Sequence, residues 1–163
     1  MFERLVRVNA ASDESQEVLT ARKVAAIVAT LTADITGFSK VDHRVLPRNF
    51  ADKLVGYMHG FSLTICAAWR ITEPGVPRAA TRFAASFVLP HVEAHYLDQI
   101  VNQIGSCAEF SAGRDAGLAD GNRYVATGRR GTALIEMLMD RTGAAVAPFE
   151  TDRGLSGQVS QEA

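Results

Sequence analysis

The chain has 163 residues, a length suited to a single domain of about 150 residues. With 47% hydrophobic and 21% charged residues, its composition excludes an intrinsically disordered chain. The formal net charge of −1 predicts no general electrostatic attraction to nucleic acid or to an acidic membrane. Alanine occurs 25 times and aromatic residues make up only 7%, so the composition favours closely packed helices over a sheet sandwich.

The first predicted helix spans residues 12–35. Ser12 or Asp13 can accept hydrogen bonds from the free amides of its first turn, and Gly37 is a suitable residue to end it. Its apolar residues recur every three or four positions and form one face, namely Val18, Ala21, Val24, Ala25, Val28, Leu31 and Ile35. This pattern is typical of an amphipathic helix that covers a core.

The second predicted helix, residues 47–72, is apolar on two sides. Pro47 suits its first turn, where a missing amide hydrogen costs nothing. Residues 54–69 contain no Asp, Glu, Lys or Arg, but this run is shorter than the roughly 20 apolar residues of a membrane span. Because a helix with two apolar sides is normally surrounded by its neighbours, we expect it to be the buried centre of the domain.

The third predicted helix spans residues 76–104 and contains Pro90, which removes one internal hydrogen bond. We therefore expect a kink near Leu89, or two helices that meet there. Residues 106–119 are compatible with a short helix, but residues 112–131 hold five glycines and are interpreted as the loop-like part of the chain. Residues 132–142 are predicted to form a last amphipathic helix.

These elements predict an all-α protein, a compact bundle of about four to five helices with a buried central helix (47–72) and a Pro-kinked third helix. One domain is expected over residues 1–148. The polar, glycine-bearing residues 149–163 are predicted to be a flexible C-terminal tail.

Two features favour contacts between chains. The N-terminal segment 1–11 carries apolar side chains without an evident place in the bundle, which makes it a candidate docking arm. A pair of glycines four residues apart lets a second helix approach closely, within the fold or across a subunit boundary. The predicted interface residues are therefore Phe2, Leu5, Val6, Gly56 and Gly60.

Histidines supply a candidate metal or haem site. On one helix, His91 and His95 would project from the same face, the spacing at which two imidazoles share a metal. His59, in the central helix, is the candidate third ligand. The alternative reading makes His91 and His95 exposed polar residues and His59 a hydrogen-bonded core residue. A dimetal carboxylate site is excluded, because no Glu stands three residues before a His.

The glycine- and arginine-rich segment 113–132 is a second candidate site. Arginines beside the free amides of a helix start can hold a phosphate or a carboxylate, and the residues for this role are Arg123, Arg129 and Arg130. The segment lacks the lysine and the spacing of a phosphate-binding P-loop. An anion-dependent enzyme is the function that this site would imply, and a solvated loop is the simpler interpretation.

The remaining signals favour a protein without catalytic activity. The chain has no Gly-x-Ser-x-Gly motif, and no cofactor is expected. Its two cysteines, Cys66 and Cys107, lack a metal-type spacing and are predicted to be reduced thiols in a cytoplasmic protein. The N-terminus lacks the apolar core of a signal peptide. We therefore expect a helical protein that acts through protein–protein contacts, as a homo-oligomer or an assembly subunit, with neither nucleic acid nor membrane as its partner.

Overall fold

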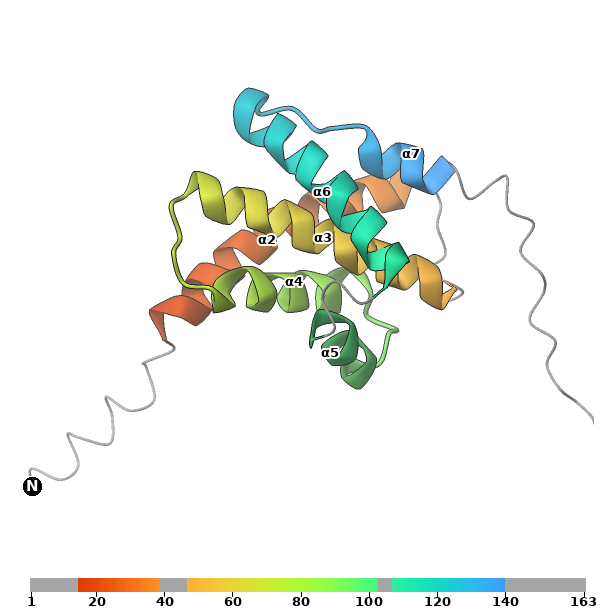
Figure 1. Cartoon of the computed structure of the whole chain (residues 1–163), viewed down its shortest axis with the longest axis horizontal. Helices are drawn as coiled ribbons and strands as arrows, with labels where there is room; N and C mark the ends of the chain where they lie inside the picture. Colours follow the sequence, from red (N-terminus) through yellow and green to blue (C-terminus); the bar gives the residue numbers. More distant parts are fainter. Residues whose placement is uncertain (1–14, 39–46, 103–106, 140–163) are drawn as a thin grey trace, which may run out of the picture.

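The computed structural model describes residues 15–38, 47–102 and 107–139. Within these ranges the chain is helical and contains no strand, which confirms the predicted all-α bundle. Its helices are α2 (Gln16–Phe38), α3 (Arg48–Ala68), α4 (Gly75–Val88), α5 (Ala94–Asn102), α6 (Ala108–Thr127) and α7 (Ala133–Met139) (Figure 1). The predicted arm with Phe2, Leu5 and Val6 and the predicted tail 149–163 lie outside the described residues.

Helix α3 forms the centre of the bundle, as its two apolar sides predict. It contacts α2, α4, α5 and α6, and Leu54 and Met58 are fully buried. Pro47 directly precedes the helix, and its carbonyl accepts hydrogen bonds from the amides of Phe50 and Ala51 at 2.9 and 3.1 Å. A proline is tolerated here because the first amides of a helix have no partner within it.

The central helix ends earlier than residue 72, in a left-handed turn at Arg70, whose φ is 57°. The Arg70 amide donates to the Ala67 carbonyl and the Ile71 amide to the Cys66 carbonyl, at 3.1 and 2.9 Å. This pair of bonds is the Schellman arrangement, in which glycine usually occupies the left-handed position. Arginine takes that position here.

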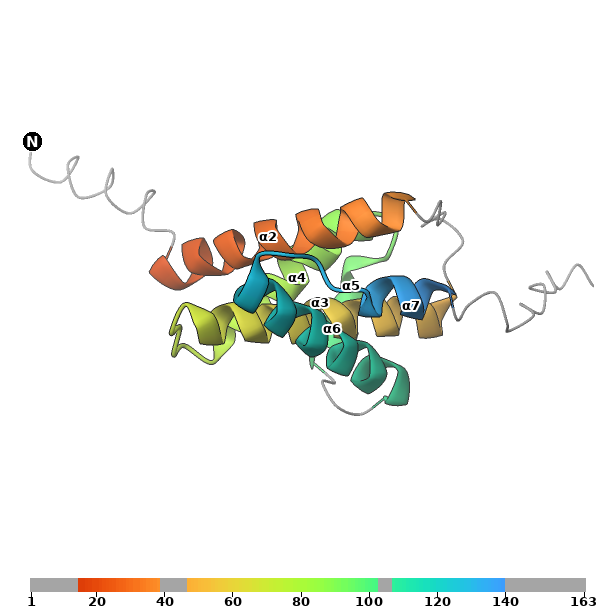
Figure 2. The same ribbon diagram turned by 90° about the horizontal axis from the view of Figure 1, so that it is seen from above.

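Helices α2 and α4 run in the same direction along one side of α3 (Figure 2). The start of α4 lies beside the start of α2, since Gly75 faces the Glu17 side chain. Further along, the guanidinium of Arg22 lies over the ring of Phe83, 5.5 Å from its centroid. The two helices therefore have their positive ends together and their negative ends together.

The predicted third helix is two helices in the structure. Helix α4 ends at Val88, the buried Leu89 has a non-helical backbone (φ −121°, ψ 59°), and α5 begins at Ala94. A residue before a proline is disfavoured in the helical region because the proline ring crowds its backbone. Leu89, which precedes Pro90, is where the helix ends.

The prediction of a loop over residues 112–131 is wrong. Helix α6 continues to Thr127 and includes three of the glycines, Gly113, Gly117 and Gly121, which recur every four residues and so lie on one face. That face packs on α3, the most extensive helix contact in the described chain. The glycines are needed for packing rather than for a turn.

Gly56 and Gly60 of α3 lie in this same contact and face the backbone of α6. A Cβ atom on Gly56 would lie 2.2 Å from the Phe110 carbonyl oxygen, and one on Gly60 would lie 2.1 Å from that of Arg114. Both distances are far below van der Waals contact. The close approach that this glycine pair allows is therefore made within the fold, against α6.

Candidate functional site

His59 is buried between α3 and its neighbours. Its Nδ1 atom lies 3.1 Å from the Thr81 hydroxyl oxygen, while that hydroxyl donates to the Pro77 carbonyl at 2.7 Å. Because Thr81 has only one hydroxyl hydrogen, Nδ1 of His59 must be the donor in the first bond. The imidazole also stacks at a tilt on Phe110, with 5.8 Å between ring centroids.

This environment keeps the His59 ring neutral. Burial, together with the positive charges of Arg114 and Arg78, lowers the pKa of His59 to about 4. A neutral imidazole that donates from Nδ1 is a hydrogen-bonded core group.

His91 and His95 are not on one helix. His91 lies in the turn between α4 and α5, whereas His95 is the second residue of α5, and both are exposed. The Nε2 atom of His95 lies 3.1 Å from Nε2 of Gln99. Within the described residues, His, Cys, Asp and Glu side chains form no group of three that could hold a metal ion. The structure therefore does not bring His59, His91 and His95 together.

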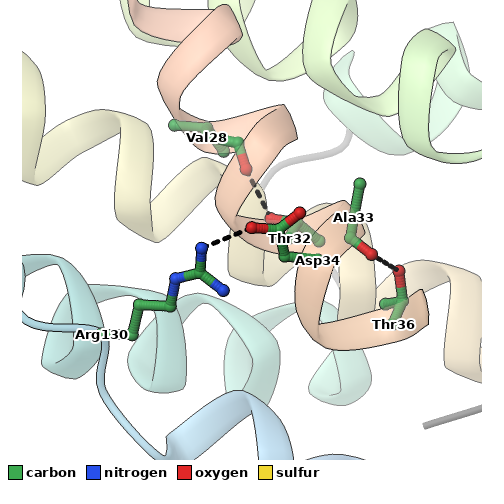
Figure 3. Close-up of polar contacts among 6 residues, drawn as sticks. All are labelled: Val28, Thr32, Ala33, Asp34, Thr36 and Arg130. Carbon is green, nitrogen blue, oxygen red and sulfur yellow. Dashed lines mark hydrogen bonds and ion pairs between the residues drawn. The ribbon is translucent and has the colours of Figure 1, made fainter. Parts of the chain in front are cut away.

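The three candidate anion-binding arginines are exposed and have different environments. Arg130 forms an ion pair with Asp34 of α2 (Figure 3). Arg129 follows the end of α6, and its amide donates to the Thr127 hydroxyl at 3.1 Å. Arg123 lies on the outer face of α6. Arg130, which was predicted to bind an external anion, is thus already paired with a carboxylate of its own chain.

Helix α2 carries its own buried polar groups beside this ion pair. The hydroxyls of Thr32 and Thr36 donate to the carbonyls of Val28 and Ala33, at 2.7 and 3.1 Å (Figure 3). These bonds use the hydroxyl hydrogens within the helix, so neither threonine has a hydrogen left to donate to a ligand.

Sequence reasoning missed Asp120, a buried carboxylate of α6. It accepts hydrogen bonds from the amides of Ala133 and Leu134, both at 3.1 Å, and from the Tyr57 hydroxyl at 3.0 Å. Asp120, on α6, thereby caps the first turn of α7. The sequence predicts free amides at this helix start that would bind an external anion, but the Asp120 carboxylate already accepts their hydrogen bonds. Burial, together with the negative charge of Asp120 and the hydrogen bond to it, raises the pKa of Tyr57.

Gly131 makes room for this cap. A Cβ atom at that position would lie 1.7 Å from Oδ1 of Asp120. The carboxylate and the glycine come from positions 11 residues apart, and no local motif joins them. The contact between Asp120 and Gly131 is evident only from the packing of α6 against α3 and α7.

A second polar cluster joins α3, α5 and α6 around Cys107. The Cys107 sulfur accepts the Phe110 amide at 3.5 Å and so caps α6, and it lies 3.2 Å from Oε2 of Glu109. The Tyr96 hydroxyl donates to Asp52 at 2.8 Å, and burial together with this bond raises the pKa of Tyr96 to about 12. The Cys107 thiol and the Tyr96 hydroxyl thus each donate to a carboxylate, that of Glu109 and that of Asp52.

An apolar groove lies between α2 and α4 on the described surface. Its volume is about 270 Å³, and it is lined by Ala25, Ala26, Ala29, Thr30, Phe83 and Phe87. Of these lining residues, Phe87 is 69% exposed, the highest exposure among the large apolar side chains of the described residues. We call the groove and Phe87 together the α2–α4 face.

Comparisons of the chain with protein-family models, with curated proteins and with solved structures found no match. Among the described helices, none is both long enough and apolar enough to cross a membrane. The geometry of the chain itself is therefore the basis for a functional assignment.

Proposed function

We propose that this is a non-enzymatic helical protein that acts through protein–protein contacts made by its α2–α4 face. The observation that carries this proposal is Phe87. Its aromatic ring is 69% exposed and lines a groove together with Phe83 and the methyl groups of three alanines, so these side chains form a continuous apolar surface. Contiguous apolar surface of this kind is characteristic of interaction sites.

The chemistry of the other candidate sites supports the same choice. His59 is a neutral donor to Thr81, and the Asp120 carboxylate is engaged by three donors of its own chain. Groups whose hydrogen bonds are completed within the fold have little left for a substrate. The two cysteines are free thiols, in keeping with our proposal that the protein works in the reducing cytoplasm.

A photo-reactive phenylalanine analogue in place of Phe87 tests this function in the intact cell. We expect irradiation to join the chain covalently to another protein chain. The matched control carries the same analogue in place of Val125, which is 47% exposed near the end of α6. Equal or absent cross-linking at the two positions would contradict a contact role for the α2–α4 face.

A further inference from the structure

We infer that residues 129–139 form a strap that opens and closes on the bundle as one unit, with Gly128 as its hinge. The strap consists of the segment that follows α6 and of helix α7, which packs on α6 and α2 (Figure 1). Two carboxylates are its latches, that of Asp120 and that of Asp34. The inference does not depend on the contact role of the α2–α4 face, because the strap contains none of the residues that line that face.

Gly128 has the properties of a hinge. It ends α6 with a φ of 66°, and a Cβ atom at this position would meet no atom beyond its chain neighbours within 4 Å. Glycine adopts left-handed and right-handed backbone conformations about equally readily. The backbone at this position can therefore rotate without breaking a packing contact.

Helix α7 depends on the bundle for its structure, because seven residues are too few for a stable isolated helix in water. Of its residues, Leu134 and Leu138 are buried, whereas fourteen residues of α3 are buried. Regions with few buried apolar contacts open at a lower free-energy cost than the whole domain. Detachment of the strap should therefore be more frequent than global unfolding.

Polar contacts with other helices hold the strap closed. Asp120 of α6 accepts hydrogen bonds from the amides of Ala133 and Leu134, both at 3.1 Å. Asp34 of α2 forms an exposed ion pair with Arg130 (Figure 3). Water can hydrate these groups once the strap opens, so the net stabilisation from each contact is modest. Such latches favour the closed strap without fixing it permanently.

Opening of the strap would change the surface of the bundle. Leu134 and Leu138 are buried while the strap is closed, and Asp120 is 3% exposed. Detachment would bring these two apolar side chains and the carboxylate into contact with solvent. The strap is therefore a conformational device that controls the exposure of a second surface.

Native-state hydrogen exchange followed by NMR tests the strap in the purified full chain. The Leu134 amide is held by Asp120, and the Glu136 amide by the Thr132 carbonyl at 2.9 Å. Opening as one unit releases both amides together, so we expect them to be protected equally. Their protection should be at least about tenfold lower than that of the Met58 amide in the buried centre of α3.

Val76→Ala separates strap opening from global unfolding. Val76 is fully buried in α4, whereas α7 packs on α6 and α2. The cavity should lower the protection of the Met58 amide by about tenfold. Because the strap opens while α4 stays folded, the protection of the Leu134 and Glu136 amides should not change.

Arg130→Gln removes the latch to Asp34. We expect it to lower the protection of the Leu134 and Glu136 amides by the same factor, up to about fivefold, as the strength of exposed ion pairs implies. The control is Arg123→Gln, at an exposed position of α6, which should leave both amides unchanged. Unchanged protection of these amides in Arg130→Gln would contradict the role of Asp34 as a latch.

Two results would overturn the strap itself. Amides of Leu134 and Glu136 that are as protected as that of Met58, or that lose protection in parallel with it in Val76→Ala, would show that α7 detaches only when the whole bundle unfolds. A Leu134 amide better protected than that of Glu136 would show that α7 frays from its end instead of opening as one unit.

Discussion

The Tyr57 hydroxyl donates a 3.0 Å hydrogen bond to Asp120, and through this carboxylate the central helix is tied to the start of α7. Both side chains are buried, at 1% and 3% exposure. The Asp120 carboxylate accepts hydrogen bonds from the Tyr57 hydroxyl and two backbone amides, and among the described residues no ion pair to it is found. Three helices, α3, α6 and α7, therefore depend on one carboxylate.

Replacement of this carboxylate should destabilise the fold. Asp120→Asn keeps one acceptor oxygen but turns the other into a donor, which then faces a backbone amide, that of Ala133 or that of Leu134. We expect a loss of about 1–3 kcal/mol in the free energy of unfolding, the cost of an unsatisfied buried polar group. Urea denaturation measures it. The control Asp115→Asn changes an exposed aspartate of the same helix and should alter stability by less than about 0.5 kcal/mol.

The glycine contact between α3 and α6 should tolerate no added methyl group. In isolation Gly117→Ala would favour a helix by about 1 kcal/mol. In the protein its Cβ would lie 2.0 Å from the Tyr57 carbonyl oxygen, so we expect a net destabilisation of about 1–3 kcal/mol from overpacking. Thermal unfolding followed by circular dichroism provides the measurement. Asn122→Ala, on the exposed face of α6, should be neutral or stabilising, and the same result for Gly117→Ala would refute the contact.

The neutral His59 predicts a loss of stability in acid. Its pKa is about 4 in the folded chain against 6.5 for the free side chain, so below pH 6.5 the unfolded chain binds a proton that the folded chain does not. The contribution of His59 is complete above pH 6.5 and falls as the pH decreases toward 4, with a slope of at most about 1.4 kcal/mol per pH unit.

Urea denaturation of the unmodified chain and of His59→Asn between pH 4 and pH 7 isolates this contribution. The asparagine amide can still donate to Thr81 but does not titrate, so the variant should lose less stability over this range. Parallel pH profiles for the two proteins would show that His59 is not a neutral buried group.

The left-handed turn after α3 predicts a stabilising substitution. Arg70 has a φ of 57°, a conformation that costs a residue with a Cβ atom about 1–2 kcal/mol. Arg70→Gly should therefore raise the free energy of unfolding by about 0.5–1 kcal/mol, less than the full cost because glycine is more flexible in the unfolded chain. Arg70→Ala keeps the Cβ atom and should give no such gain. If Arg70→Ala stabilised the protein equally, the gain would come from removal of the arginine charge and not from relief of the backbone strain.

Periodicity in the sequence predicted the helices whose apolar residues form a strong pattern. The face of α2 and the two-sided burial of α3 were readable because leucine, valine, isoleucine and phenylalanine recur at helical spacing. Pro90 likewise marked the end of α4, because its ring constrains the residue before it.

The full length of helix α6 was missed because its contact face consists of glycine. Gly113, Gly117 and Gly121 contribute no apolar side chain, so a search for hydrophobic periodicity interprets them as turn residues. Their four-residue spacing, matched by Gly56 and Gly60 on α3, was the signal that could have identified a helix pair.

The polar sites could be predicted less well than the fold, because they depend on which residues meet across helices. Asp120 meets Tyr57 across 63 positions of the chain, and no pattern in the sequence joins them. The expected pairing of His91 and His95 required one continuous helix, whereas the helix is interrupted between Leu89 and α5.

The accessibility of position 87 inside the cell tests the proposed contact face most directly. Phe87→Cys and the control Val125→Cys can be labelled with a thiol reagent in intact cells and in dilute purified protein, with peptide mass spectrometry reading each site separately from Cys66 and Cys107. We predict that position 87 is labelled much more slowly in cells than in dilute solution, while position 125 is labelled at similar rates in both. Equal labelling of position 87 in the two settings would contradict the claim that another protein chain covers the α2–α4 face.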